Sequence, residues 1–257
     1  MEKKGQVTIF VIIAIVIVAA GAAVYTFYPG IKDTVGLTPD NPSSFIENCM
    51  EDDLTSTIEL VSSNGGSVNP QNYFLYDESQ VDYLCYTTES LQCVVQKPLL
   101  KQSIEIEIRE NIKGKVDSCF AELRNNFESQ GHIVEYKPGE LSIELLPQII
   151  ITKIEKDLKL TKGGETENYD KIELVFNNNL YELISIANSI IESEVEFGEA
   201  ETTTYMNYYH DLKVERKEQS EGTNIYILTT RSTGDKFQFA SRSVPSYPGI
   251  IPPEFKR

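Results

Sequence analysis

The sequence predicts an α+β protein, with an N-terminal transmembrane helix followed by an ectodomain of two disulfide-stapled helices, an antiparallel sheet and a third helix. Three observations support this prediction. Residues 7–28 form one unbroken apolar run, and residues 44–131 contain two segments in which apolar residues recur with helical spacing. Apolar and polar residues mostly alternate over residues 150–241, as in strands with one solvent-exposed face, and one further helical segment lies within this range.

The apolar run Val7–Tyr28 is long enough to cross a membrane. No charged residue occurs between Lys4 and Lys32, and about 20 helical residues span the hydrocarbon core of a bilayer. A helix this apolar on every side would be unstable in water, and no other segment is apolar enough to bury it. Because Lys3 and Lys4 precede the run, the positive-inside rule places the N-terminus in the cytoplasm. We therefore expect a single-pass cell-membrane protein, held in the lipid bilayer by Val7–Tyr28, with its C-terminal domain outside the cell.

The sequence leaves three fates open for this helix. The run is longer than the ~7–15 apolar residues of an ordinary signal peptide, which favours an uncleaved signal anchor. The small residues Ala20-Gly21-Ala22 offer a signal-peptidase site, and cleavage there would release the domain. The third fate depends on the junction between the two lysines and the apolar run.

The junction Lys3-Lys4-Gly5-Gln6-Val7-Thr8 resembles the class III, type IV pilin-like signal peptides of archaea. The resemblance implies that a dedicated peptidase cuts after Gly5 and that Gln6 becomes the mature N-terminus. It also matches Thr8 to the small hydroxyl residue that these proteins often carry two residues after the mature N-terminus. Phe10 occupies the fifth mature position, where pilins carry a glutamate that helps to align subunits in a filament. The resemblance therefore favours an archaeal surface protein over a pilus subunit.

The charge of the chain limits its partners. The formal net charge is −16, and the 38 acidic and 21 basic residues beyond Lys4 give the exported part −17. An acidic exterior argues against nucleic acid and against anionic lipid headgroups as partners. Solubility or adaptation to salt explains this charge more simply than a specific cationic ligand does.

The four cysteines predict disulfides, because an even number of cysteines outside the cell is typical of a disulfide framework. No CxxC spacing or paired histidine accompanies them, which argues against a metal site. Four cysteines allow three pairings. Cys85 and Cys93 flank the turn-like residues 87–90, which favours a local hairpin bridge and leaves Cys49 with Cys119. Both of the latter lie on apolar helical stripes, so we expect a structural staple and not a redox pair.

Two amphipathic helices are expected in the cysteine-containing part. The first begins at Ser44, which forms a capping box with Glu47, and ends at Asn64-Gly65-Gly66. The second has Pro98 in its first turn and ends at Gly131. The apolar stripes are Ile46, Met50, Leu54, Ile58 and Val61 in the first helix, and Leu100, Ile104, Ile108, Ile112, Val116, Leu123 and Phe127 in the second.

Strands are expected between and after these helices. Tyr73–Tyr76 and Tyr83–Tyr86 are strand-like, and one strand over residues 150–160 leads through the turn 162–165 to a return strand over 169–176. A third helix is capped by Asn179, with Glu182 in the reciprocal position, and ends at Gly198. Its core face comprises Leu180, Ile184, Ala187 and Ile191, and three more strands follow over residues 212–216, 223–229 and 236–241.

These elements predict five consecutive parts of the chain. They are a cytoplasmic stub with the transmembrane helix (1–28), a linker (29–42), a helical disulfide-containing part (43–131), an antiparallel sheet plus helix (132–244) and a Pro-rich tail (245–257).

No catalytic signature occurs in the sequence. His132 and His210 lack the spacing of a zinc site, and no G-x-S-x-G motif is present. The glutamates between Glu192 and Glu201 crowd the end of the third helix, but without the residue pattern of a calcium loop. A structural cation there is therefore the less favoured alternative to a solvated surface. We expect a non-enzymatic protein with no catalytic residue, no cofactor and no metal site.

The most suggestive stretch for binding is Thr202–His210. If Tyr205, Tyr208 and Tyr209 are exposed, their flat apolar faces and polar edges suit a glycan or a protein partner at the cell surface. The alternative, favoured by the usual burial of tyrosine, is that these rings cover the sheet below them.

The segments Phe45–Cys49, Tyr83–Tyr86 and Lys236–Arg242 resemble an uncharacterised family of single-span proteins in small-genome archaea. This resemblance implies a location and no activity. The leading expectation is a surface protein that mediates envelope or cell-surface interactions, and a pilin-like filament subunit is the second hypothesis. The third is an extracellular binding or hydrolytic module in which Glu194, Glu196, Tyr205 and His210 converge in one pocket.

Overall fold

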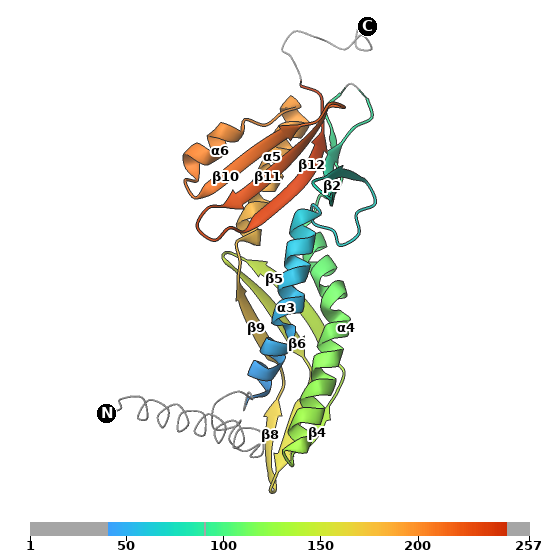
Figure 1. Ribbon diagram of the computed structural model, residues 1–257, viewed down its shortest axis with the longest axis vertical. Coiled ribbons are helices and arrows are strands. Elements are labelled where there is room, and N and C mark those ends of the chain that lie inside the picture. The colour runs from blue at the N-terminus through green and yellow to red at the C-terminus, as the bar shows by residue number, and fades with distance from the viewer. Residues whose placement is uncertain (1–40, 90, 246–257) are drawn as a thin grey trace, which may run out of the picture. The chain divides into compact units, whose positions relative to one another are not determined.

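The computed structural model describes residues 41–89 and 91–245. This part of the chain is α+β and is drawn in Figure 1. It contains four helices, three sheets and two disulfides. The apolar run, the Gly5–Gln6 junction, residues 29–40 of the linker and residues 246–257 of the tail lie outside the described residues. Among the helices of the described ranges, none combines the length and the apolar character needed to cross a membrane. The chain divides into two compact units, Met1–Asn48 and Cys49–Arg257, and every described helix and strand belongs to the second unit except the start of α3.

Helix α3 (Pro42–Ser63) has the predicted apolar stripe, and all five of its residues are buried. The predicted capping box at Ser44 is wrong, because the helix begins two residues earlier. The side-chain Oδ1 of Asn41 accepts a hydrogen bond from the Ser43 amide, and Pro42 takes the first helical position. The helix ends before Gly65, whose left-handed φ of 70° provides the stop that the sequence predicts.

Helix α4 (Leu100–Ser129) also buries its whole predicted stripe, and Gly131 follows its end with a left-handed φ of 87°. Pro98 lies in the turn before the helix and not in its first turn, because Leu99 is the N-cap residue. Polar side-chain contacts are among those that hold α4 to α3. Lys115 Nζ lies 3.0 Å from Asp53 Oδ2, and Asn111 Nδ2 donates to Thr57 Oγ1 at 2.8 Å.

A six-stranded mixed sheet has the order β1-β2-β12-β11-β10, with β3 paired to β2. The expected all-antiparallel sheet is wrong here, because β12 pairs with β2 in parallel. The reason is topological: β2 comes from the cysteine-containing part and joins the edge of a sheet built by the last three strands. The strands are β1 (Tyr73–Tyr76), β2 (Ser79–Tyr86), β3 (Val94–Val95), β10 (Leu212–Glu218), β11 (Thr223–Thr230) and β12 (Lys236–Arg242).

Two three-stranded antiparallel sheets, β4-β7-β8 and β5-β6-β9, lie between α4 and α5 in the chain. The predicted strand over 150–160 is wrong as one element, since it breaks at Lys156 and Asp157 into members of different sheets. The predicted return strand over 169–176 is also broken, at Asp170 and Lys171. These two residues lie opposite the break at Lys156 and Asp157 in the strand pairing. The strands are β4 (Ile133–Tyr136), β5 (Glu140–Leu146), β6 (Ile149–Glu155), β7 (Leu158–Lys162), β8 (Glu165–Tyr169) and β9 (Ile172–Asn177).

Contacts with α4 and with the segment before β5 explain the break at Lys156. Its ammonium group lies 2.6 Å from Asp117 Oδ1 and 4.7 Å from the ring of Phe120, both on α4. In the segment just before β5, Gly139 approaches Glu155 so closely that a Cβ atom on this glycine would overlap the Glu155 carbonyl oxygen. The alternation of apolar and polar residues along this segment does not reveal these contacts.

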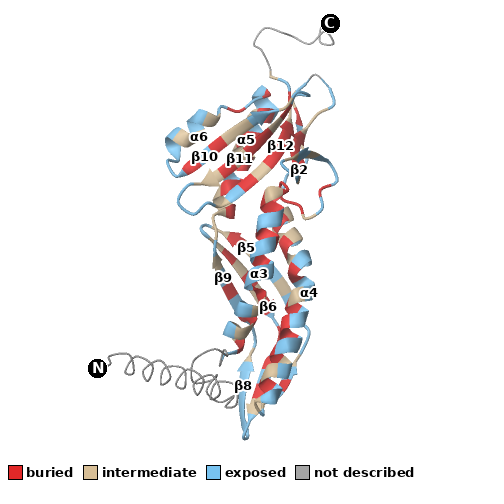
Figure 2. Ribbon diagram, in the orientation of Figure 1, coloured by how far each residue is buried: buried red, intermediate tan, exposed pale blue. Residues whose placement is uncertain are grey.

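Helix α5 (Leu180–Phe197) contacts β2, β11 and β12, and its predicted core face is buried (Figure 2). Asn179 is the N-cap residue by position, but the predicted capping box is absent. The Asn179 side chain donates to Asp235, and Asn178 Oδ1 accepts from the Leu180 amide instead. Gly198 closes the helix in the left-handed region, as predicted.

Candidate functional site

The two disulfides have the predicted pairing. Cys49 on α3 is bonded to Cys119 on α4, with their Cα atoms 5.9 Å apart. Cys85 on β2 is bonded to Cys93 at a Cα separation of 5.3 Å, beside the antiparallel pairing of β2 with β3. The first bridge joins two helices and the second closes a hairpin, so both are staples of the fold.

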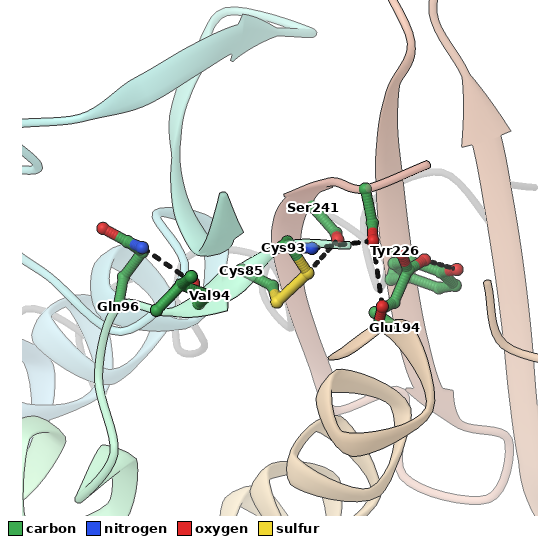
Figure 3. Close-up of a disulfide and its surroundings, with 8 residues drawn as sticks. Cys85, Cys93, Val94, Gln96, Glu194, Tyr226 and Ser241 are labelled. Carbon is green, nitrogen blue, oxygen red and sulfur yellow. Dashed lines mark hydrogen bonds between the residues drawn. A yellow bond between two sulfur atoms is a disulfide. The ribbon is translucent and has the colours of Figure 1, made fainter. Parts of the chain in front are cut away.

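The Cys85–Cys93 bridge borders a buried polar cluster at the end of α5 (Figure 3). The Cys93 amide donates to Ser243 Oγ at 3.0 Å, and Ser243 Oγ donates to the Glu194 carbonyl at 2.9 Å. Ser241 Oγ lies 3.9 Å from the sulfur of Cys93. These bonds tie the hairpin, the end of β12 and the last turns of α5 together.

Glu194 is the buried member of the acidic cluster that the sequence shows. Its carboxyl group is fully buried and accepts a hydrogen bond from the Tyr226 hydroxyl on β11 (Figure 3). Burial raises the pKa of Glu194, although the nearby hydroxyl groups of Tyr226 and Ser241 oppose the shift. Burial also raises the pKa of the Tyr226 phenol, and the Glu194 carboxyl group adds to this increase.

The remaining glutamates of that cluster do not surround Glu194. Glu192, Glu196, Glu199 and Glu201 are exposed, whereas Glu194 faces the sheet. Among the described residues, no three or more His, Cys, Asp and Glu side chains are grouped so that they could hold a metal ion. The cluster therefore divides into one buried structural carboxyl group and a solvated acidic surface.

The predicted tyrosines lie on and just after a short helix that sequence reasoning missed, α6 (Thr202–Tyr208). Tyr208 is 80% exposed and Tyr209 is 56% exposed, so the alternative in which their rings cover the sheet is wrong for these two. Tyr205 is half-buried, and its hydroxyl lies 3.0 Å from Ser189 Oγ on α5. The structure therefore presents two of the three rings to solvent and uses the third to join two helices.

A hollow lies on either side of the Tyr205–Ser189 contact, between α5 and the segment formed by α6 and β10. One hollow, of about 320 Å³, has Leu183, Ile186 and Tyr209 in its wall. The other, of about 430 Å³, has Phe197 and Tyr205 in its wall. We call these two hollows together the α5–α6 groove. The wall of the first hollow is mainly apolar, whereas that of the second also carries Glu199, Glu201 and Arg216. Apolar surface beside such polar groups suits a peptide or sugar ring.

The third hypothesis required four side chains to converge. The hollow that Tyr205 lines includes none of Glu194, Glu196 and His210. Glu194 faces Tyr226 in the layer between α5 and the sheet, and His210 is exposed after α6. The predicted convergence is therefore absent from this groove. The other histidine, His132, packs its ring 5.4 Å from that of Phe127.

Helix α6 was missed because its first three residues are threonines, which disfavour helix through their branched side chains. A local signal was present: the side chain of Glu201 accepts from the Thr203 amide and caps the helix. The groove itself has no sequence signal, since its walls come from α5, α6 and β10. Comparison with models of protein families, with curated proteins and with solved structures finds no match for this chain.

Proposed function

We propose that this protein is a non-enzymatic, membrane-anchored extracellular surface protein whose ectodomain binds a protein or glycan partner at the cell envelope. The observation that carries the proposal is the charge-free apolar run Val7–Tyr28 directly behind Lys3 and Lys4. A run of this length fits a bilayer, and the two lysines favour a cytoplasmic N-terminus. The two disulfides support an extracellular domain, because such bridges persist in oxidising compartments.

The binding surface that we propose comprises the exposed rings of Tyr208 and Tyr209 with the adjoining α5–α6 groove. Large exposed aromatic side chains are enriched at protein interfaces, where the ring supplies apolar area and the hydroxyl supplies a hydrogen bond. The acidic charge of the chain argues against a nucleic-acid partner. A partner with apolar or aromatic contacts and few negative charges fits this surface.

The location is tested with a protease that cannot cross membranes. In intact cells, the protease should digest the part of the chain after Tyr28. In inside-out vesicles, the same part should be protected unless detergent is added. Digestion in inside-out vesicles but not in intact cells would overturn the proposed orientation.

A second candidate function, a pilin-like filament subunit, is favoured by the junction at Gly5 and Gln6. Mass spectrometry of the mature N-terminus from the native membrane fraction distinguishes the two. A protein that begins at Gln6 would support processing of the pilin type, and one that begins at Met1 would support a plain anchor. A start near Tyr25 would contradict both and would indicate a released protein.

A further inference from the structure

The described chain ends beside one end of the α5–α6 groove. Val244 and Pro245 pass so close to Gly198, at the end of α5, that a Cβ atom on this glycine would overlap their backbone. Phe197, Glu199 and Ala200, which flank Gly198, line the hollow at this end. The tail that follows Pro245 therefore starts within reach of the groove.

The tail is long enough to reach the far hollow. Seventeen positions separate Tyr181, which lines the far hollow, from Gly198, and at ~1.5 Å per residue this part of α5 is roughly 26 Å long. The ten steps from Pro245 to Phe255 cover roughly 31 Å at ~3.1 Å per residue. Extended chain of this length reaches the far hollow.

The tail and the far hollow are complementary in polarity and charge. The tail carries the apolar residues Ile250, Ile251 and Phe255. Glu254 precedes Phe255 and Lys256 and Arg257 follow it, so these side chains add up to a charge of +1. The wall of the far hollow combines apolar side chains with two acidic residues. These wall residues are Leu183, Ile186, Tyr209 and Leu212, with Glu182 and Asp211.

We propose that residues 246–257 occupy the α5–α6 groove of the same molecule, with Ile250 and Ile251 along it and Phe255 in the hollow between Ile186 and Tyr209. Lys256 and Arg257 then lie near Glu182 and Asp211. This inference does not depend on the proposed function, because it concerns this chain alone.

Photo-cross-linking of the full chain in detergent micelles tests the inference. In the variant Phe255→p-benzoylphenylalanine, illumination should join position 255 to peptides that contain Tyr181–Ile186 or Tyr209–Leu212. A mixture of ¹⁴N- and ¹⁵N-labelled protein shows which chains are joined. Cross-links within one isotope would support the proposal. Cross-links between isotopes, to detergent alone or to other parts of the chain would overturn it.

A pair of matched variants tests whether the hollow itself binds the tail. Ile186→Lys places a positive charge in the wall of the hollow and should abolish the cross-link. Leu75→Lys makes the same kind of change at a 65% exposed side chain on β1 and should leave it unchanged. The tail variant Ile250→Ser with Ile251→Ser should also weaken the cross-link while the domain keeps its circular dichroism spectrum. An undiminished cross-link in both Ile186→Lys and the tail variant would overturn the proposal.

Discussion

The hydroxyl of Tyr226 donates a hydrogen bond to the carboxyl group of Glu194, and both side chains are fully buried between α5 and the six-stranded sheet. Burial disfavours the charged form of each group and raises both pKa values. The stability of the packing between α5 and the sheet should therefore depend on pH.

Stability should decrease as pH rises through the range in which Glu194 ionises. The folded state raises the pKa of Glu194 and so binds its proton more tightly than the unfolded chain does. Its contribution is fully present below the unfolded pKa, about 4.3, and is lost as pH rises through the folded pKa. The free energy lost is about 1.4 kcal/mol for every pH unit that separates the folded pKa from the unfolded pKa. Urea unfolding at a series of pH values measures it.

Glu194→Gln should remove this pH dependence, because the amide accepts from Tyr226 and does not ionise. The matched control is Glu192→Gln, an exposed glutamate two residues earlier on α5. The control should keep the pH profile of the wild type. If Glu194→Gln also kept that profile, another group would be responsible for it.

The two disulfides should differ in their contribution to stability. Cys49 and Cys119 are 70 positions apart, whereas Cys85 and Cys93 are 8 apart. On the chain-entropy estimate, the longer loop stabilises the fold by about 4 kcal/mol and the shorter one by about 2.5 kcal/mol. Replacing each pair by alanine and measuring the free energy of unfolding tests this order. A reductant breaks both bridges of the wild type. It should therefore lower the free energy of unfolding of the wild type below that of either double variant without reductant.

Two glycine-to-alanine substitutions should have opposite effects. Gly139→Ala should lower the free energy of unfolding by about 1–3 kcal/mol, because its Cβ would overlap the backbone of Glu155, at the end of β6, and displace the segment before β5. Gly114→Ala lies in the interior of α4 with open space around it, so it should raise stability by about 1 kcal/mol. Chemical denaturation followed by circular dichroism measures both. An equal response at the two sites would contradict the steric argument.

Replacing Tyr208 and Tyr209 with alanine should separate binding from stability. Both rings are largely exposed, so the free energy of unfolding should change by no more than about 0.5 kcal/mol. On the proposed function, attachment of the purified protein to envelope fragments should decrease. Tyr73→Ala removes a 43% exposed ring on β1 and serves as the control, with attachment expected to stay unchanged. Equal attachment by all variants would exclude Tyr208 and Tyr209 from the binding surface.

Local patterns in the sequence predict much of the fold. The stripes of α3, α4 and α5 follow from helical spacing, because one face of each helix must leave water. Gly131 and Gly198 mark helix ends, since left-handed backbone favours glycine. The two disulfide pairings also follow from the spacing of the cysteines and the helices that carry them.

Only the tertiary structure decides where distant segments meet. Nothing near β2 indicates that it pairs with β12 in parallel, and alternation alone does not reveal that α4 binds Lys156 and breaks a strand. The exposed Glu192 and the buried Glu194 look alike in sequence, because burial depends on Tyr226 in another element. Spacing along the chain determines periodic faces and turns. The pairing of remote strands, the burial of one carboxyl group and the α5–α6 groove depend on contacts between residues far apart in the chain.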